Sequence, residues 1–396
     1  MGIMPVWKDE GSKLRLQQLS KPTQPRGNIH QYMKLLQEEI NQKVIIQVNP
    51  HHIKLYSPTF CIPKRDGSYR KILDARNLNT ETKRIHFKMI SSQDVQFAIQ
   101  QNDFLTSLDI KSAFNHITVH PSLQPYLGFQ VANASYVYIG MPFGLKLAPI
   151  VFSKTLQAAL AAAKEGLTST ILQYADDILL INKDKQVLLV ETVTVKQRLI
   201  NLGWVINNVK SEMIPKQEIR YLGWIWDTKL MTARMPLNRQ QKLFFRLSQM
   251  IQQTINRQFV RIKEVAKLIG KLQFLKFQFQ LASFHLIKLN RIKDRAARLR
   301  GWDSTLQLKL TILPELFWWH SMILANKPLE LLMKSTVTAT LTTDASKTGW
   351  GAVLNMNQQE ILASATWKKP LSLRSSNQRE ARAILYALRR FKKQLM

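Results

Sequence analysis

The chain has 396 residues, of which 45% are hydrophobic and 9% aromatic, and 57 lysines and arginines against 26 acidic residues give a net charge of +31. This length allows two or more domains, and the apolar fraction is ordinary for a globular protein. The sequence contains no run of about 18 apolar residues and no signal-peptide core, so we expect no membrane span and an intracellular location, nuclear or cytoplasmic. Cys61 is the single cysteine, which excludes an intramolecular disulfide and a cysteine-based zinc cluster. A basic excess this large indicates a polyanionic partner, and nucleic acid is the usual one.

The first 30 residues are polar and contain Pro22 and Pro25, so we interpret them as an N-terminal arm or linker. Residues 28–43 place apolar side chains at helical spacing and predict an amphipathic helix. Two apolar runs then flank Asp66-Gly67, which predicts a β-hairpin over residues 57–74.

Four cations cluster around the turn of this hairpin: Lys64, Arg65, Arg70 and Lys71. A basic hairpin above a metal site can clamp a triphosphate, because cations stabilise transferring phosphoryl groups. The alternative is a solvated edge hairpin whose charges prevent unwanted strand pairing.

Three aspartates stand out in the next part of the chain. Asp109 ends an apolar strand pattern that begins at Phe104, and Asp176 and Asp177 form the tip of a strand–turn–strand pattern between apolar flanks. Adjacent carboxylates in apolar surroundings raise each other's pKa and resist burial unless a cation offsets them. Mg²⁺ fits, because it binds one or two carboxylates together with substrate phosphates. Two-metal phosphoryl transfer needs carboxylates from separate elements around ions about 3.5–4 Å apart, which these residues supply. A simple Asp-Asp turn is the alternative.

Further elements surround these aspartates. We expect helices over residues 91–103, 148–163 and 186–202, and a second hairpin over residues 127–139. Between the second hairpin and the 148–163 helix, Gly140 and Gly144 bracket Met141-Pro142-Phe143, and glycine allows close backbone approach to a ligand.

Residues 237–300 form a separate, helical and strongly basic unit, with 15 lysines and arginines against Glu264 and Asp294. A helix over about residues 257–276 carries Lys263, Lys267 and Lys271 on one face. Such a stripe follows a phosphate backbone, although a basic solvated face without a ligand is the alternative.

Several of these segments resemble the palm motifs of reverse transcriptases, in the order of that family: Ser107–Phe114, Gly140–Leu145 and Tyr174-Ala175-Asp176-Asp177. The resemblance is greatest to retrotransposon enzymes of the DIRS-like or LTR-retroelement type. It implies an α+β right-hand polymerase with an antiparallel palm sheet and a helical thumb. The implied division is an arm (1–30), fingers and palm (31–236), thumb and connection (237–335) and a partial ribonuclease H-like α/β segment (336–396).

The resemblance also implies roles for individual residues. Asp109, Asp176 and Asp177 would hold two Mg²⁺ ions, with Mn²⁺ as the alternative ion, and Lys210 would act as a general acid when pyrophosphate leaves. Phe114 would exclude a 2′-hydroxyl, although a plain core aromatic is the other interpretation. The remaining implied roles are binding of the nucleotide and template by Lys64, Arg65, Arg70, Phe143, Gly144 and Tyr174, a primer grip at Tyr221, Leu222 and Gly223, and duplex binding by Lys263, Lys267 and Lys271. For Tyr221 and Leu222, ordinary strand packing is the alternative.

The C-terminal segment resembles the front of a ribonuclease H fold, with a strand that carries Asp344, two further strands and a helix that carries Glu380. That family's site needs four carboxylates, and only these two match before the chain ends. We therefore expect no independent ribonuclease H activity.

The sequence thus predicts an RNA-directed DNA polymerase of a retrotransposon. Its expected partners are an RNA template, an RNA/DNA or DNA duplex and deoxynucleoside triphosphates, without a membrane, and the oligomeric state is left open. Two alternatives are a decayed or domesticated element fragment that only binds nucleic acid and an RNA-directed RNA polymerase, which Phe114 disfavours.

Overall fold

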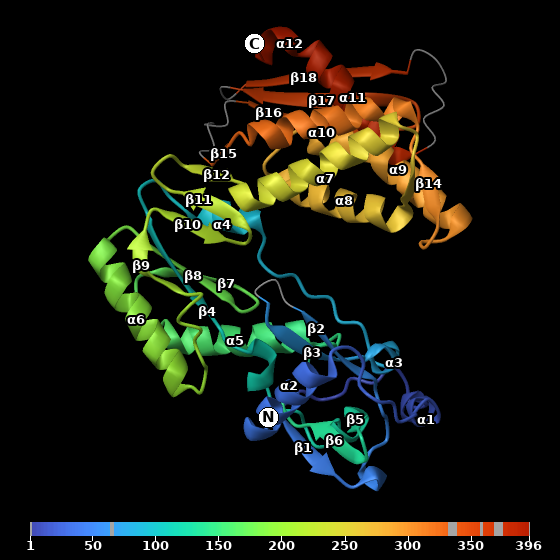
Figure 1. Ribbon diagram of the computed structural model, residues 1–396. Coiled ribbons are helices and arrows are strands. Elements are labelled where there is room, and N and C mark those ends of the chain that lie inside the picture. The colour runs from blue at the N-terminus through green and yellow to red at the C-terminus, as the bar shows by residue number, and fades with distance from the viewer. Residues whose placement is uncertain (1, 64–66, 332–338, 357–358, 368–374, 396) are drawn as a thin grey trace. The chain divides into compact units, whose positions relative to one another are not determined.

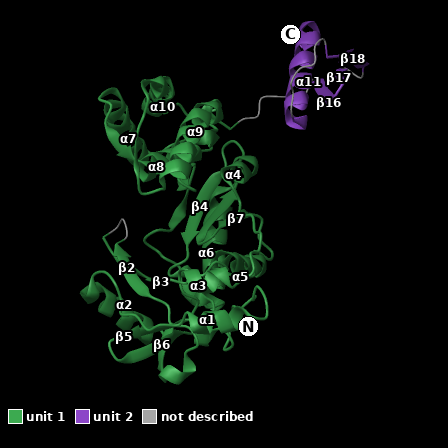
Figure 2. Cartoon of the chain, turned by 90° about the vertical axis from the view of Figure 1, so that its right-hand side faces the viewer, with its two compact units in different colours: residues 1–331 green, residues 332–396 purple. Residues whose placement is uncertain are grey.

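The computed structural model describes residues 2–63, 67–331, 339–356, 359–367 and 375–395 (Figure 1). The chain divides into two compact units, residues 1–331 and 332–396, shown in different colours in Figure 2. Within the described residues, no helix combines the length and the apolar character that crossing a bilayer requires.

The residues of the larger unit up to Tyr138, other than those of the palm elements given below, form the fingers. Its antiparallel sheet has the order β1-β6-β5, and a separate two-stranded hairpin consists of β2 and β3. The elements of this region are α1 (Ser12–Gln18), α2 (Ile29–Asn41), β1 (Ile45–Val48), β2 (Thr59–Pro63), β3 (Tyr69–Leu73), α3 (Arg76–Thr80), β5 (Gly128–Val131) and β6 (Ala134–Tyr138). The β2–β3 hairpin lies within residues 57–74, where the sequence predicts it, and α2 coincides closely with the predicted helix.

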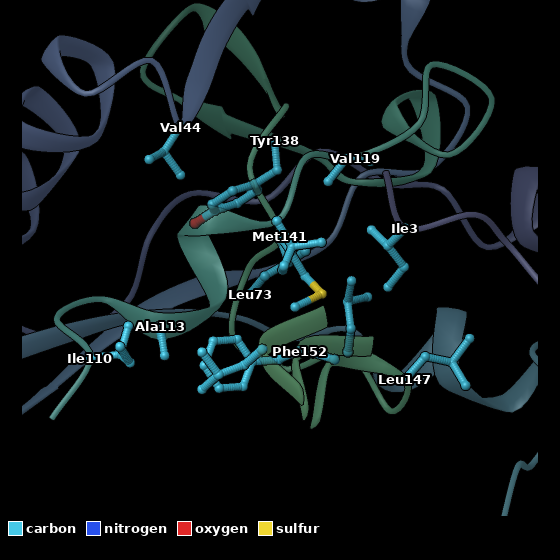
Figure 3. Packing of buried hydrophobic residues seen from close by; sticks show 14 of the residues in the cluster. Ile3, Val44, Leu73, Ile110, Ala113, Val119, Tyr138, Met141, Leu147 and Phe152 are labelled. Atoms are coloured by element: carbon cyan, nitrogen blue, oxygen red, sulfur yellow. The ribbon is translucent and has the colours of Figure 1, made fainter. Parts of the chain in front are cut away.

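The first 30 residues pack onto the fingers. Ile3 is 2% exposed and its N–H donates to the carbonyl of Thr118, while Leu16 is fully buried. Figure 3 shows Ile3 in the same buried cluster as Met141 and Phe152, which belong to later segments. The apolar residues scattered through this polar segment are therefore core residues of the fingers.

The palm is a four-stranded antiparallel sheet with the order β7-β8-β4-β9, and α5 and α6 pack against it. The palm elements are α4 (Ser92–Ala98), β4 (Phe104–Asp109), α5 (Ala148–Ala163), β7 (Thr170–Tyr174), β8 (Asp177–Asn182), α6 (Lys185–Asn201) and β9 (Glu212–Lys216). The helix α4 is shorter than the predicted 91–103, and its N-terminus carries a capping box between Ser91 and Asp94.

A second four-stranded sheet and a helical bundle complete the larger unit. The sheet has the order β10-β11-β12-β15, and the helices α7 to α10 share one buried cluster with it. The elements are β10 (Glu218–Tyr221), β11 (Trp224–Asp227), β12 (Thr232–Arg234), α7 (Leu237–Ile255), β13 (Phe259–Arg261), α8 (Ile262–Phe274), α9 (Ala282–Arg300), β14 (Thr305–Gln307), α10 (Leu313–Ala325) and β15 (Leu329–Glu330). The helices α7 to α10 lie within residues 237–335, and the assignment of these residues as thumb and connection stays a prediction.

The smaller unit is a three-stranded antiparallel sheet with the order β16-β17-β18 and a helix packed on it. Its elements are β16 (Ala339–Ala345), β17 (Gly349–Met356), β18 (Gln359–Thr366), α11 (Ser376–Arg390) and α12 (Lys392–Leu395). Leu354, Ala387 and Phe391 form the centre of its small core. The strand and helix order is the one that the sequence predicts for this segment.

Candidate active site

The three aspartates meet at one end of the palm sheet. Strands β4 and β8 run antiparallel with Asp109 opposite Asp177, and β7 returns to β8 with Tyr174 opposite Asp177. Ala175 takes a left-handed conformation, with φ of +49°, which makes the turn between them tight. The backbone carbonyl of Asp176 accepts a hydrogen bond from the N–H of Ile110, 3.1 Å away, and so ties the turn to the end of β4.

Burial and mutual repulsion act on these carboxylates. Burial raises the pKa of Asp177 to about 6, and the charges of Asp176 and Asp109 add to this effect. Burial followed by the charge of Asp176 raises the pKa of Asp109 as well. Lys210 opposes both shifts, which places its positive charge near the carboxylates, but it does not cancel them. The site therefore holds more negative charge than the protein itself neutralises.

The end of β4 is fixed by the loop that carries Lys210. The N–H of Asp109 donates to Ser211 Oγ at 3.0 Å, and the N–H of Asn207 donates to the carbonyl of Asp109 at 2.8 Å. Ser211 Oγ in turn donates to the carbonyl of Asn207 at 2.8 Å. The sequence pattern did not single out Asn207 or Ser211 as supports of the site.

The chemistry of this donor set fits a divalent cation. Over the described parts of the chain, no three His, Cys, Asp or Glu side chains are already gathered as a ready-made metal site. Mg²⁺ does not need one, because it keeps several waters and completes its shell with substrate phosphates. The raised pKa values of Asp109 and Asp177 indicate that positive charge from outside the protein would stabilise them.

Next to the palm, Arg70 contacts Phe143, which in turn contacts Phe114. The guanidinium carbon of Arg70 lies 4.4 Å from the ring centre of Phe143, and the ring centres of Phe143 and Phe114 are 4.8 Å apart. Gly144 fixes this arrangement, because its φ is +117° and an added Cβ would lie 2.2 Å from the carbonyl oxygen of Leu73. The N–H of Leu73 donates to the carbonyl of Phe143 at 3.3 Å, which joins β3 to the loop. Lys64 and Arg65 lie outside the described residues.

Lys71 does not lie with the other turn cations. Its side chain is fully buried and pairs with Glu39 at 2.6 Å, whereas Arg70 on the opposite face of the same strand is exposed. Lys71 and Arg70 therefore have different environments, one in the core and one at the surface, although they are neighbours in sequence.

The predicted primer grip is the turn between β10 and β11. Leu222 and Gly223 both have positive φ, of 49° and 79°, and Tyr221 is 3% exposed with its hydroxyl donating to the carbonyl of Asp177 at 3.3 Å. Arg239 of α7 donates to the carbonyl of Gly223 at 3.1 Å and lies over the ring of Phe274.

Phe274 of α8 continues this contact toward the palm. Its ring stacks on Trp224 with centres 4.7 Å apart, and the indole N–H of Trp224 donates to Ser92 Oγ at 3.0 Å. The sequence analysis missed Arg239, Trp224 and Phe274; the tryptophan directly after Gly223 was the one available signal.

A groove of ≈ 1350 Å³ lies between α7 and α8. Its lining includes the cations Arg220, Arg239, Lys242, Arg246, Arg261 and Lys271. Of the three predicted duplex-binding lysines, Lys271 lines this groove, whereas Lys263 pairs with Asp303 and Lys267 pairs with Glu264. The positive lining comes mostly from α7 and from strand residues that the helical spacing of α8 did not reveal.

In the smaller unit, Asp344 lies on β16 opposite Gly351 of β17, and Glu380 lies on α11, which packs against β16. The roles that the ribonuclease H resemblance implies for these two acids stay predictions.

A palm sheet with carboxylates at one end, a basic hairpin on one side and a helical bundle on the other defines the right-hand polymerase class. Residues 62–226 match the family model for reverse transcriptase (RNA-dependent DNA polymerase), so this part of the chain is similar to a reverse transcriptase domain.

Similar sequences are polyproteins of a fission yeast transposon. The Tf2-3 polyprotein of Schizosaccharomyces pombe is 28% identical over 193 residues, covering 48% of this chain and 14% of the polyprotein, and the Tf2-7 polyprotein is 27% identical over the same length. The chain thus spans about one seventh of the length of these curated relatives.

Similar folds occur in foamy viral protease–reverse transcriptase. The dRH form in complex with double-stranded DNA has a TM-score of 0.65 at 17% identity, covering 99% of this chain and 63% of that one. The same protein in complex with an RNA/DNA hybrid has a TM-score of 0.64 at 17% identity, covering 94% and 48%. These likenesses show that the chain has the reverse transcriptase polymerase fold.

Proposed function

We propose that this chain is the RNA-directed DNA polymerase of a retrotransposon and adds deoxynucleotides to the 3′-end of a primer. The observation that carries the proposal is that Asp109 lies opposite Asp177 at the end of the palm sheet, next to Asp176. The negative charge of these carboxylates is not fully neutralised by the protein. Reverse transcriptases as a family work with divalent metal ions, and this domain matches that family.

The proposed reaction is a single displacement at the α-phosphorus of the nucleotide. The primer 3′-oxygen forms a bond to the α-phosphorus of the nucleotide, the bond from that phosphorus to the pyrophosphate oxygen breaks, and the proton of the 3′-hydroxyl is lost. Two divalent ions held by Asp109, Asp176 and Asp177 would activate the 3′-oxygen and neutralise the phosphates. The charge of Lys210 acts on Asp109 and Asp177, which supports a role for Lys210 as the acid that would protonate the leaving pyrophosphate.

The nucleotide would bind to the three contacting residues Arg70, Phe143 and Phe114. The exposed guanidinium of Arg70 binds the triphosphate as a charge-assisted donor. Phe114 packs against Phe143 and Phe152, and its ring would exclude a 2′-hydroxyl by close contact. The enzyme would therefore prefer deoxynucleotides to ribonucleotides.

Template and primer would lie along the groove between α7 and α8 and end at the turn of Leu222 and Gly223. The groove has six cationic side chains in its lining, and a polymerase needs binding that is independent of sequence. The solved relatives with double-stranded DNA and an RNA/DNA hybrid support both duplex types as partners.

Primer extension tests the proposal. The purified chain is given an RNA template with an annealed DNA primer, deoxynucleotides and Mg²⁺ or Mn²⁺, beside the Asp176→Asn variant. We expect extension by the wild type, none by the variant, and much weaker extension when ribonucleotides replace deoxynucleotides. Salt-sensitive duplex binding without any extension would instead assign the chain a binding role.

A further inference from the structure

The buried lysine Lys71 has a role that the turn cations around it do not share. Its side chain has no exposed surface, and its Nζ lies 2.6 Å from Glu39 Oε2. Three aromatic rings surround the amine, with centres at 4.1 Å for Phe129, 5.0 Å for Tyr138 and 5.5 Å for Tyr32. We call Glu39, Tyr32, Phe129 and Tyr138 the lysine cage.

The cage joins elements that share no backbone ladder with the strand of Lys71. Glu39 and Tyr32 come from α2, and Phe129 and Tyr138 come from β5 and β6. The hairpin of β2 and β3 forms a sheet of its own, whereas β5 and β6 belong to another sheet. A two-stranded hairpin is only marginally stable alone, so its position depends on side-chain contacts such as these.

Burying an ammonium is costly unless it is well paired. Burial lowers the pKa of Lys71, and the charge and hydrogen bond of Glu39 counteract this shift. An aliphatic side chain would fill the same space without that cost, so packing alone does not explain a lysine here. The buried ammonium of Lys71, however, is stabilised only where it meets Glu39. This pairing therefore favours one register of the strand.

Register decides where Arg70 points. Neighbouring residues of a strand face opposite sides, and a slip by one residue exchanges them. With Lys71 in the cage, Arg70 faces outward and lies over Phe143. The hydrogen bond from Leu73 to Phe143 still holds the far end of β3 when Lys71 leaves the cage, so the displacement would fall on the part of the strand that carries Arg70, and the guanidinium would lose its defined place.

We propose that Lys71 is a positioning residue, which through the lysine cage holds β3 so that Arg70 meets the triphosphate of the incoming nucleotide. This inference rests on the proposed polymerase function and on the role given to Arg70. It assigns to the chain a determinant of nucleotide affinity that itself touches no nucleotide.

The test compares nucleotide KM and kcat for four variants at saturating template–primer, below their melting temperatures. Lys71→Met keeps the length of the side chain and removes the charge. Lys71→Met with Glu39→Gln removes both charges and guards against a folding failure of the single variant. Lys34→Met, an exposed lysine on α2, controls for lost charge, and Leu16→Ala, a buried residue of the same cluster outside the cage, controls for lost stability.

We expect Lys71→Met to raise the nucleotide KM by about tenfold or more, with duplex affinity unchanged, because small misplacements of a binding group cost this much. The neutral double variant should melt closer to the wild type and still show a raised KM. The variants Lys34→Met and Leu16→Ala should keep the wild-type KM. A KM near the wild-type value for Lys71→Met, or an equal rise in Leu16→Ala, would overturn the proposal.

A combination with Arg70→Ala separates positioning from general structure. If Lys71 acts through Arg70, adding Lys71→Met to Arg70→Ala should change the nucleotide KM little further, because both changes remove the same contact. Fully additive effects would contradict the proposal.

A second readout does not depend on activity. Amide hydrogen exchange in Tyr69–Leu73 should become faster in Lys71→Met than in Leu16→Ala, and equal rates would count against the cage as an anchor. Wild-type protein without extension, but with this exchange difference, would defeat the proposed function and leave the anchoring intact.

Discussion

The pKa values of the acidic side chains at the two ends of strand β7 are shifted in opposite directions. Where β7 begins, Glu191 of α6 is 8% exposed and accepts hydrogen bonds from Thr168 N at 2.9 Å, Thr168 Oγ1 at 3.0 Å and Ser169 N at 2.8 Å. Burial alone would raise the pKa of Glu191, but the hydrogen bonds from Ser169 and Thr168 outweigh it and lower the pKa.

Where β7 ends, Asp177 lies beside Asp176 and opposite Asp109, and burial with these two charges raises its pKa to about 6. We interpret the difference as a division between an acid that stabilises the fold and acids that would serve the proposed chemistry. Glu191 has its partners within the protein, whereas Lys210 offsets the charge of the aspartates only in part, and an added cation would offset the remainder.

The largest expected effect is on catalysis at the aspartate end. Asp177→Asn should slow single-nucleotide extension by about a thousandfold or more, since it removes a charge needed in the transition state. Rapid-quench extension measures this rate. Glu212→Gln, which changes an exposed acid on β9 of the same sheet, is the matched control and should extend like the wild type. Comparable losses in both variants would mean that the sheet, and not the site, had been damaged.

At the other end of the strand, the expected loss is one of stability. Glu191→Ala leaves the donors of Thr168 and Ser169 without their acceptor and should lower the free energy of unfolding by about 2–3 kcal/mol. Because the pKa of Glu191 is lowered in the fold, its contribution is present above the unfolded-state value of 4.5 and disappears as the pH falls through the folded-state value.

Denaturant unfolding at pH 7 and pH 3 measures both effects of Glu191→Ala. The exposed Glu165→Ala should change little. Extension per folded molecule should remain at the wild-type rate, and a selective loss of activity in Glu191→Ala would remove the contrast between the two ends.

A smaller effect of opposite sign is expected for the stability of Asp177→Asn without metal. The pKa of Asp177 is raised from 3.8 to about 6, so its protonated form favours folding at low pH, and this advantage is lost as the pH rises through 6. Asparagine has no charge to bury and should stabilise the protein at pH 8 by about 1–2 kcal/mol, after allowance for partial exposure. The gain should vanish below pH 4.

Thermal unfolding with and without Mg²⁺ measures this effect. Millimolar Mg²⁺ should stabilise the wild type at pH 8 and leave Asp177→Asn nearly unchanged. An Asp177→Asn protein that is less stable than the wild type at pH 8 would show that the fold itself depends on this carboxylate.

The smallest effect should come from Tyr221→Phe. The hydroxyl of Tyr221 donates to the carbonyl of Asp177 at 3.3 Å and links the predicted primer grip to the end of the palm sheet that carries the aspartates. Its loss should cost about 0.5–1 kcal/mol and slow extension a few-fold without changing nucleotide KM. Steady-state kinetics with varied primer and varied nucleotide distinguish this from an effect on nucleotide binding, which would appear as a raised nucleotide KM.

Much of the palm could be predicted because its signals are local. The turn at Asp176 and Asp177 lies between two apolar runs, and Asp109 ends a third, so the pattern of the sequence contains the strands and their acids together. The same holds for the hairpin around Asp66-Gly67 and for helix α5, whose observed bounds of Ala148–Ala163 equal the predicted ones.

The parts that the sequence did not reveal depend on distant partners. Lys71 and Glu39 are 32 residues apart, and neither looks different from a surface residue until the fold brings them together. Glu191 resembles any acid on a helix, because its donors come from the start of β7. Strand alternation was the one signal that could have separated Lys71 from Arg70, since neighbours on a strand face opposite sides.

The N-terminal segment shows a limit of composition. Its prolines and polar residues indicated an arm, but Ile3 and Leu16 are core residues of the fingers. Two apolar residues thirteen positions apart form no periodic pattern, so only the surface that they cover identifies them as buried.

The most direct test of the central claim is a side-by-side extension assay on an RNA template with the wild type, Asp176→Asn and Glu191→Gln, each at a temperature where it is folded. The account predicts Mg²⁺-dependent extension by the wild type and by Glu191→Gln and none by Asp176→Asn. Extension by Asp176→Asn, or its loss in folded Glu191→Gln, would contradict the division of the palm into a structural and a catalytic end.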